Sequence, residues 1–119
     1  MKFEAIDPQL IKEIAPSFYH KSTAFYAIKH QNKDAGLLSI KALSNKTAEL
    51  GLLIFPPYRG KLLTPHKCKQ ILRFTELKGF VYIIIGTYLE SMKKLCQAFH
   101  FSYLFTQQNK HWLKKELRA

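Results

Sequence analysis

The chain has 119 residues, of which 47% are hydrophobic and 13% are aromatic. This length is enough for one domain with a packed core, residues 1–119, and too short for two independent cores, while the composition excludes a disordered tail. A formal net charge of +11 predicts attraction to polyanions, whether nucleic acid, an anionic membrane or a phosphorylated ligand. Because the lysines are spread along the whole chain, a solvated basic surface is the alternative interpretation.

Membrane spans and metal sites have no support in the sequence. The longest apolar run, Phe80 to Gly86, is far shorter than the roughly 20 residues that a spanning helix needs. Residues 1–6 alternate charged and apolar side chains and lack the apolar stretch of a signal peptide, so we expect a cytoplasmic protein. Cys68 and Cys96 lie on apolar stripes of predicted helices without the spacing of a zinc site, which predicts buried thiols and no metal.

The first half of the chain predicts four strands and one short helix. Residues 1–6 alternate as a strand, and Asp7-Pro8 then supplies a helix N-cap followed by proline at the first helical position. Strand-forming residues recur, separated by turn residues, at 23–30, 36–43 and 48–55. These three strands predict an antiparallel meander.

The second half predicts helices alternating with strands. Thr64-Pro65 begins a helix that Gly79 ends, and the apolar residues 80–85 are typical of a strand covered on both faces. Thr87 and Glu90 have the spacing of a capping box for a second helix. Two strands joined by a turn are expected at the end of the chain, at 101–106 and 111–117, although the last segment also suits a short helix.

This order of elements predicts an α+β (α/β) fold: a mixed central sheet with an antiparallel N-terminal meander, one parallel β-α-β unit and a C-terminal hairpin. The order is similar to that of the GNAT (N-acetyltransferase) superfamily. Residues Ala48 to Lys61, Ala-Glu-Leu-Gly-Leu-Leu-Ile-Phe-Pro-Pro-Tyr-Arg-Gly-Lys, resemble that family's fourth strand and the opening of its acyl-CoA motif. Ser91 to Phe101 resembles its last helix, with His100-Phe101 where the family usually has Gly-Phe. The chain lacks the second helix of the family's N-terminal arm.

The phosphate-binding motif departs from the family's pattern. The family has Gln or Arg, two residues, Gly, one residue, and then Gly or Ala; starting at Arg59, this chain has Leu62 and Thr64 at the two small positions. Small residues matter there because they let backbone N–H groups approach a pyrophosphate at a helix N-terminus. The alternative interpretation is a basic surface turn before a helix. The resemblance implies acetyl-CoA as cofactor, bound by Leu53, Ile54, Phe55, Arg59, Gly60, Lys61, Leu62, Leu63 and Thr64.

The resemblance also implies a base and an acid. Glu49 corresponds to an acid that often deprotonates the attacking amine in the family; pairing with a lysine is the alternative. Cys96 aligns with the tyrosine that commonly protonates the departing thiolate, and Tyr88 and Tyr103 are alternatives for that role. His66, at the start of a helix, is a further candidate for holding phosphate. Core packing or solvent exposure is the competing explanation for each.

Two functions of different classes follow. The first is an acyl-CoA-dependent N-acyltransferase acting on an amine acceptor. The second is a GNAT-like domain with altered chemistry that binds nucleic acid or protein through its basic surface, with a phage or a mobile element as one source that this character suggests. The lost glycines and the charge of +11 favour the second function. The oligomeric state, monomer or dimer, is left open, as are the acceptor and the acyl group.

Overall fold

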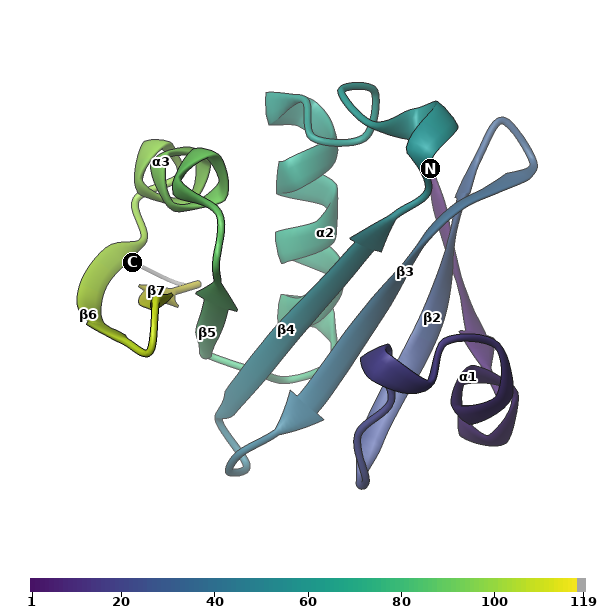
Figure 1. The fold of residues 1–119 in the computed structure, drawn as a ribbon, viewed down its shortest axis with the longest axis horizontal. Helices are drawn as coiled ribbons and strands as arrows, with labels where there is room; N and C mark the ends of the chain where they lie inside the picture. The colour runs from purple at the N-terminus through teal and green to yellow at the C-terminus, as the bar shows by residue number, and fades with distance from the viewer. Residues whose placement is uncertain (118–119) are drawn as a thin grey trace.

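A computed structural model describes residues 1–117 of the chain. Seven strands form one mixed sheet in the order β1-β2-β3-β4-β5-β7-β6 (Figure 1). The strands are β1 (Lys2–Ile6), β2 (Thr23–His30), β3 (Lys33–Ala42), β4 (Thr47–Ile54), β5 (Tyr82–Thr87), β6 (Ser102–Gln107) and β7 (Lys110–Glu116). The helices are α1 (Pro8–Ile14), α2 (Pro65–Leu77) and α3 (Glu90–Ala98), with 3₁₀ turns η1 (Pro16–Phe18) and η2 (Pro56–Tyr58).

The predicted α+β architecture is confirmed. Strands β2, β3 and β4 form the antiparallel meander, β4-α2-β5 is the parallel unit, and β6 and β7 form the C-terminal hairpin. The last segment is therefore a strand rather than a short helix. Within residues 1–117, no helix has both the length and the apolar character that crossing a membrane requires.

The two faces of the sheet are covered differently because successive side chains of a strand point to opposite faces. On one face, Leu38 and Leu50 pack with Ile71 of α2 and Cys96 of α3 in the main core. On the other face, Phe25 and Leu37 pack with Ile11 of α1 in a smaller cluster. Figure 1 shows α1 beside β1 and β2, at one edge of the sheet. The second face is therefore covered over the meander, and its side chains on β5 and β7 are only partly buried.

Strands β4 and β5 separate halfway along their length. Their parallel pairing runs from the Thr47 and Tyr82 pair to the Leu50 and Ile85 pair and then stops. Beyond that point β4 remains paired with β3, while the end of β5 remains paired with β7 (Figure 1). The backbone edges that face each other across this gap are available to a ligand.

The helix ends show which local signals were correct. Asp7 and Thr64 are the expected N-caps: their side-chain oxygens accept hydrogen bonds from the amides of Gln9 and Lys67. The expected capping box of Thr87 and Glu90 is wrong, because the N-cap of α3 is Leu89. The Thr87 hydroxyl instead accepts a hydrogen bond from the Leu89 amide, which fixes the turn between β5 and α3.

The strand expected at 80–85 is displaced by two residues and is covered on one face only. Ile83 is fully buried in the main core, whereas its neighbours Tyr82 and Ile84 are partly exposed on the opposite face. An apolar run is equally compatible with one or two covered faces, and α1 and η1 pack against the meander rather than against β5.

Candidate functional site

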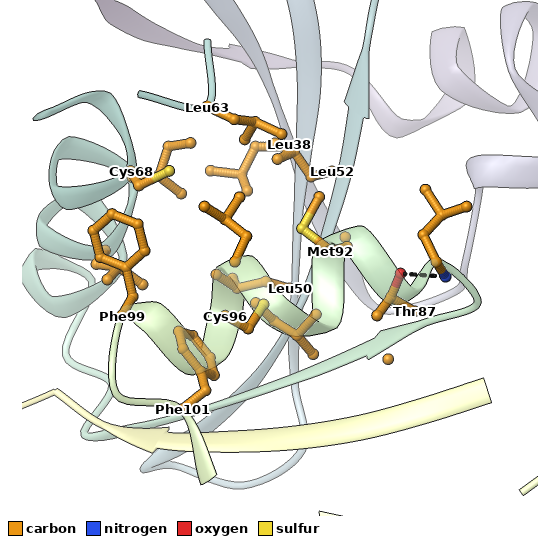
Figure 2. A pocket seen from close by; sticks show the side chains of 17 residues that line it. Leu38, Leu50, Leu52, Leu63, Cys68, Thr87, Met92, Cys96, Phe99 and Phe101 are labelled. Carbon is orange, nitrogen blue, oxygen red and sulfur yellow. Dashed lines mark hydrogen bonds between the residues drawn. The ribbon is translucent and has the colours of Figure 1, made fainter. Parts of the chain in front are cut away.

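An apolar cavity of about 200 Å³ lies between α2 and α3, beside the point where β4 and β5 separate (Figure 2). Both strands and both helices contribute walls, and no charged side chain lines it. Figure 2 shows Cys68 and Leu63 on one side and Met92 and Cys96 of α3 on another. The cavity therefore suits the apolar portion of an elongated ligand rather than a charged group.

Leu62, which occupies the position of the missing glycine, leaves this cavity open. Its side chain has 0% exposure and packs in the main core, and it is Leu63 that lines the cavity. The Tyr58 ring lies elsewhere too, edge-on to His30 with 6.1 Å between ring centroids. Neither side chain blocks the groove that a ligand would use.

The turn between β4 and α2 presents a small number of free backbone donors. The amides of Lys61 and Leu62 donate to the Tyr58 carbonyl, over 2.9 and 3.3 Å. The amides of Gly60 and Leu63 donate to no acceptor within residues 1–117. Gly60 has a φ of +80°, and a Cβ added there would meet no atom within 4 Å. Of the four amides expected to hold phosphate, the structure thus leaves two available.

Cations surround this turn. Burial lowers the pKa of His30, and the positive charges of Lys67, the Met1 amino group and Lys61 lower it further. The Lys67 ammonium donates to the Lys61 carbonyl over 2.7 Å, which holds it against the turn. A partly buried histidine whose protonation is opposed by three neighbouring cations marks a positive potential, which favours an anion.

Glu49 lies on the opposite face of the sheet from the cavity. A Cβ on Gly51 would collide with the Ser39 hydroxyl and would lie 3.4 Å from the Phe18 ring of η1, so this side of β4 faces away from α2 and α3. Glu49 shares that side, because it lies two residues from Gly51 along the strand. It forms no ion pair with the residues described, including Lys41, its register partner on β3.

We call this side of β4, β5 and β7 the open face. The register of the three strands places eight side chains on it: Thr47, Glu49, Tyr82, Ile84, Lys110, Trp112, Lys114 and Glu116. A Cβ on Gly86 would lie 2.6 Å from Lys110 Cε and 2.9 Å from the Trp112 ring, which confirms that both side chains share this face.

Two glycines flank the gap between β4 and β5. Gly51 and Gly86 both line the cavity. On the other side of the sheet, Gly51 is bordered by Ser39 and Phe18, and Gly86 by Lys110 and Trp112. Each is the first residue beyond the last paired position of its strand. The cavity and the open face therefore meet at the gap between these two glycines.

The predicted acid candidates lie in different surroundings. Cys96 has 5% exposure in the cavity wall, and burial together with the nearby Cys68 thiol raises its pKa to about 11. Tyr88 follows β5 directly, has 67% exposure, and lies with its ring centroid 5.5 Å from the Lys110 ammonium. Tyr103 is on the β6–β7 hairpin, where its hydroxyl is 2.6 Å from that of Thr106.

Other predicted ligand contacts are only partly brought together. Leu53 is exposed, whereas Ile54 packs against the main core and Phe55 against the smaller cluster. Arg59 is exposed on the turn, and Thr64 caps α2. The sequence analysis missed the wall supplied by α3, although that helix had a clear apolar stripe, and it missed the proximity of His30, which no local signal indicated.

No known family model and no curated protein matches this sequence. Solved structures match its fold. Campylobacter jejuni N-acetyltransferase PseH in complex with acetyl coenzyme A is 14% identical, with 97% of each chain covered and a TM-score of 0.72. A GNAT family acetyltransferase from Elizabethkingia anophelis with acetyl-CoA bound is 15% identical over 88% of this chain and 82% of the other, with a TM-score of 0.69. Aminoglycoside 6'-N-acetyltransferase from Enterococcus faecium is 11% identical over 98% and 97%, with a TM-score of 0.65.

These similarities show that the chain has the fold of the GNAT acetyltransferases. The resemblance inferred from the order of elements and from residues Ala48 to Lys61 is confirmed at that level.

Proposed function

We propose that the protein is a GNAT-type acetyltransferase that transfers the acetyl group of acetyl-CoA to an amine. The observation that carries this proposal is the continuity of the site. A cationic turn with two free amides lies at one end, an apolar cavity continues from it, and the cavity reaches a gap in the sheet beside a carboxylate.

The residues of the site fit the parts of acetyl-CoA in that order. The amides of Gly60 and Leu63, with Lys61 and Lys67, suit the pyrophosphate, because free N–H groups at a helix N-terminus and nearby cations both favour an anion. The apolar cavity between α2 and α3 suits the pantetheine arm. The thioester would then lie at the gap between Gly51 and Gly86.

Acetyl-CoA would supply the acetyl group as an activated thioester. In this arrangement, Glu49 accepts a proton from the amine as a new C–N bond forms and the C–S bond breaks. The free backbone edge of β4 beyond Leu50 provides N–H groups for the carbonyl oxygen. Most of the acceleration would come from holding the two reactants together at the gap.

Tyr88 is a better proton donor to the departing thiolate than Cys96. A thiol with a pKa of about 11 holds its proton strongly at neutral pH, and Cys96 packs in the cavity wall as an apolar residue would. Tyr88 follows directly after the end of β5 that borders the gap, and it is accessible.

The alternative of a binding module with lost chemistry has less support. Such a domain would be expected to fill its coenzyme groove, and Leu62 and Tyr58 were the two side chains with the position to do so. Leu62 is instead part of the core and Tyr58 packs against His30. Because Leu62 and Tyr58 leave the cavity open, the cavity remains available to a ligand.

Calorimetric titration with acetyl-CoA tests the proposal, using two glycine variants that differ only in location. Gly60 and Gly79 flank α2 at its two ends, both have positive φ, and a Cβ on either meets no atom within 4 Å. Gly60→Val and Gly79→Val therefore introduce comparable backbone strain, of about 1 kcal/mol. Only Gly60→Val places a side chain on the proposed pyrophosphate turn, and we expect it to weaken acetyl-CoA binding at least about tenfold.

Gly79→Val should bind acetyl-CoA as tightly as the unaltered protein does. Equal affinities in all three proteins would remove the pyrophosphate site from Gly60. Absence of saturable binding by the unaltered protein would remove the proposed function itself.

A further inference from the structure

The open face carries two lysines whose charges are not neutralised by an acid. Lys110 and Lys114 form no ion pair with the residues described. Their ammonium groups lie over aromatic rings instead, with Lys114 4.6 Å from the Tyr82 centroid and Lys110 4.6 Å from that of Trp112. Contacts of this kind orient an ammonium group and leave its charge available to an anion.

These cations lie at a defined separation from Glu49. The register of the sheet aligns Glu49 on β4, Ile84 on β5 and Lys114 on β7 across the strands. Two interstrand spacings correspond to roughly 10 Å. Lys110 lies closer to the gap, against Gly86. Glu49 can contact an ammonium group, and Lys110 and Lys114 can contact an anionic group. The distance between the acid and the lysines matches the length of a small molecule that carries both groups.

The surface between them is apolar. Ile84 and the rings of Tyr82 and Trp112 form it, and Phe105 of β6 extends it, with 6.5 Å between the Phe105 and Trp112 ring centroids. The open face has a second acid besides Glu49, which is Glu116 of β7. Its register partner is Tyr82, at the end of β5 away from the gap. The lysines nearest the gap therefore set the charge that an acceptor meets there.

We infer that the acceptor is a small amine that also bears an anionic group, a carboxylate or a phosphate, and that the open face discriminates against polycationic amines. In this arrangement the amine lies beside Glu49 at the gap, the apolar part of the acceptor covers Ile84 and the rings, and the anionic group contacts Lys110 and Lys114. This inference rests on the proposed acetyl transfer, because it assigns the second substrate of the same site.

Four short peptides with C-terminal amides test the inference: Ala-Tyr-Glu-Glu, Ala-Tyr-Gln-Gln, Ala-Tyr-Arg-Arg and Ala-Tyr-phosphoserine-Gln. All share the same N-terminal amine and ring and differ in charge, and the two acidic peptides, the first and the fourth, separate carboxylate from phosphate. Trp112 is the only tryptophan of the chain, so its fluorescence reports binding at the open face whether or not acetyl transfer occurs. Binding and the kcat/KM for acetylation are measured at low and high salt.

We expect an acidic peptide to bind about tenfold more tightly than the arginine peptide, with the glutamine peptide between them and the difference shrinking as salt rises. Lys114→Glu should abolish or reverse this order. Lys94→Glu, which makes the same charge change at an exposed position of α3, should preserve it.

Tighter binding or faster acetylation of the arginine peptide would overturn the inference and leave the proposed function intact. Equal binding of all four peptides would also overturn it. Tighter binding of an oligothymidylate than of either acidic peptide would replace it with a nucleic-acid surface. Preference for an acidic peptide without acetylation of any would support the selectivity of the open face and count against acetyl transfer.

Discussion

At the scale of single residues, Glu49 is the side chain on which the proposed chemistry depends most. It lies on the open face two residues before Gly51, where β4 and β5 separate, and it has no ion-pair partner within residues 1–117. We expect Glu49→Gln to lower kcat by about 10²-fold, because it removes proton acceptance, while acetyl-CoA affinity measured by calorimetry stays unchanged. Glu116→Gln is the control, because Glu116 is an acid of the same face that lies at the end of β5 away from the gap. A loss of folding in Glu49→Gln, seen by circular dichroism, would mark Glu49 as structural.

His30 provides a second prediction, on pH. Its pKa is lowered in the free protein by burial and by the charges of Lys67, Met1 and Lys61. A bound pyrophosphate would offset those charges and raise this pKa, so that binding takes up a proton and affinity rises as the pH falls from about 8 to about 6. Dephospho-CoA is the suitable ligand, since it lacks the 3'-phosphate that titrates in this range.

The slope of affinity against pH should be shallower in His30→Gln, measured by calorimetry in two buffers of different ionisation enthalpy. The two proteins differ only at position 30. Identical slopes would place the pyrophosphate away from His30.

At the scale of elements, the turn between β4 and α2 joins the core to the site. Leu62 is fully buried in the main core although its neighbours on both sides are not. We expect Leu62→Ala to lower the free energy of unfolding by about 3 kcal/mol, because it leaves a cavity in packed surroundings. Leu63→Ala, at a partly buried position that lines the ligand cavity, should cost about 1 kcal/mol. Urea denaturation measures both changes, and equal losses would contradict the separate roles of the two leucines.

The same turn explains how the site tolerates an altered phosphate motif. In the family's pattern a glycine at position 62 leaves room for a ligand. Here a leucine turns into the core, and the residue of this turn with a positive φ is Gly60, two residues earlier. The free donors are then the amides of Gly60 and Leu63. The two amides between them, of Lys61 and Leu62, donate to the Tyr58 carbonyl.

At the scale of the whole molecule, ligand binding and stability are linked. A ligand at a concentration of about 100 times its Kd stabilises the folded state by about 2.7 kcal/mol, which for a chain of this size corresponds to a rise in Tm of about 10 °C. We expect acetyl-CoA to produce this rise in a thermal melt. Acetate at the same concentration is the control for the acetyl group alone. A short DNA duplex that raises Tm while acetyl-CoA does not would favour the binding module.

The net charge of +11 belongs to this scale too. It predicts that part of any anion's affinity is lost as salt rises, because charges distributed over the surface are screened within about 10 Å at 0.1 M salt. The contribution of the two turn amides and of the apolar cavity is short-ranged and persists. The net charge by itself therefore does not show whether the protein binds a coenzyme or nucleic acid. The affinity that remains at high salt distinguishes these two ligands.

Much of the architecture follows from local signals in the sequence. Asp7-Pro8 and Thr64-Pro65 determine where two helices begin, since a capping side chain followed by proline acts through bonds within a few residues. Turn residues and alternation determine the meander, and the order of elements then leaves few topologies. The prediction of one domain over residues 1–119 stays a prediction.

Tertiary structure decided the features that depend on residues far apart in the chain. Only packing shows that β5 is covered on one face, that Leu62 enters the core and that Leu89 rather than Thr87 caps α3. Strand register places Glu49 and Lys114 on the same face, on either side of Ile84. The packing of separate elements brings Lys67 near His30. No spacing in the sequence indicates either arrangement. The periodicity of a sequence indicates which face of its own strand or helix a side chain occupies. A site forms only where the faces of several strands and helices pack together, and this is decided by the tertiary structure.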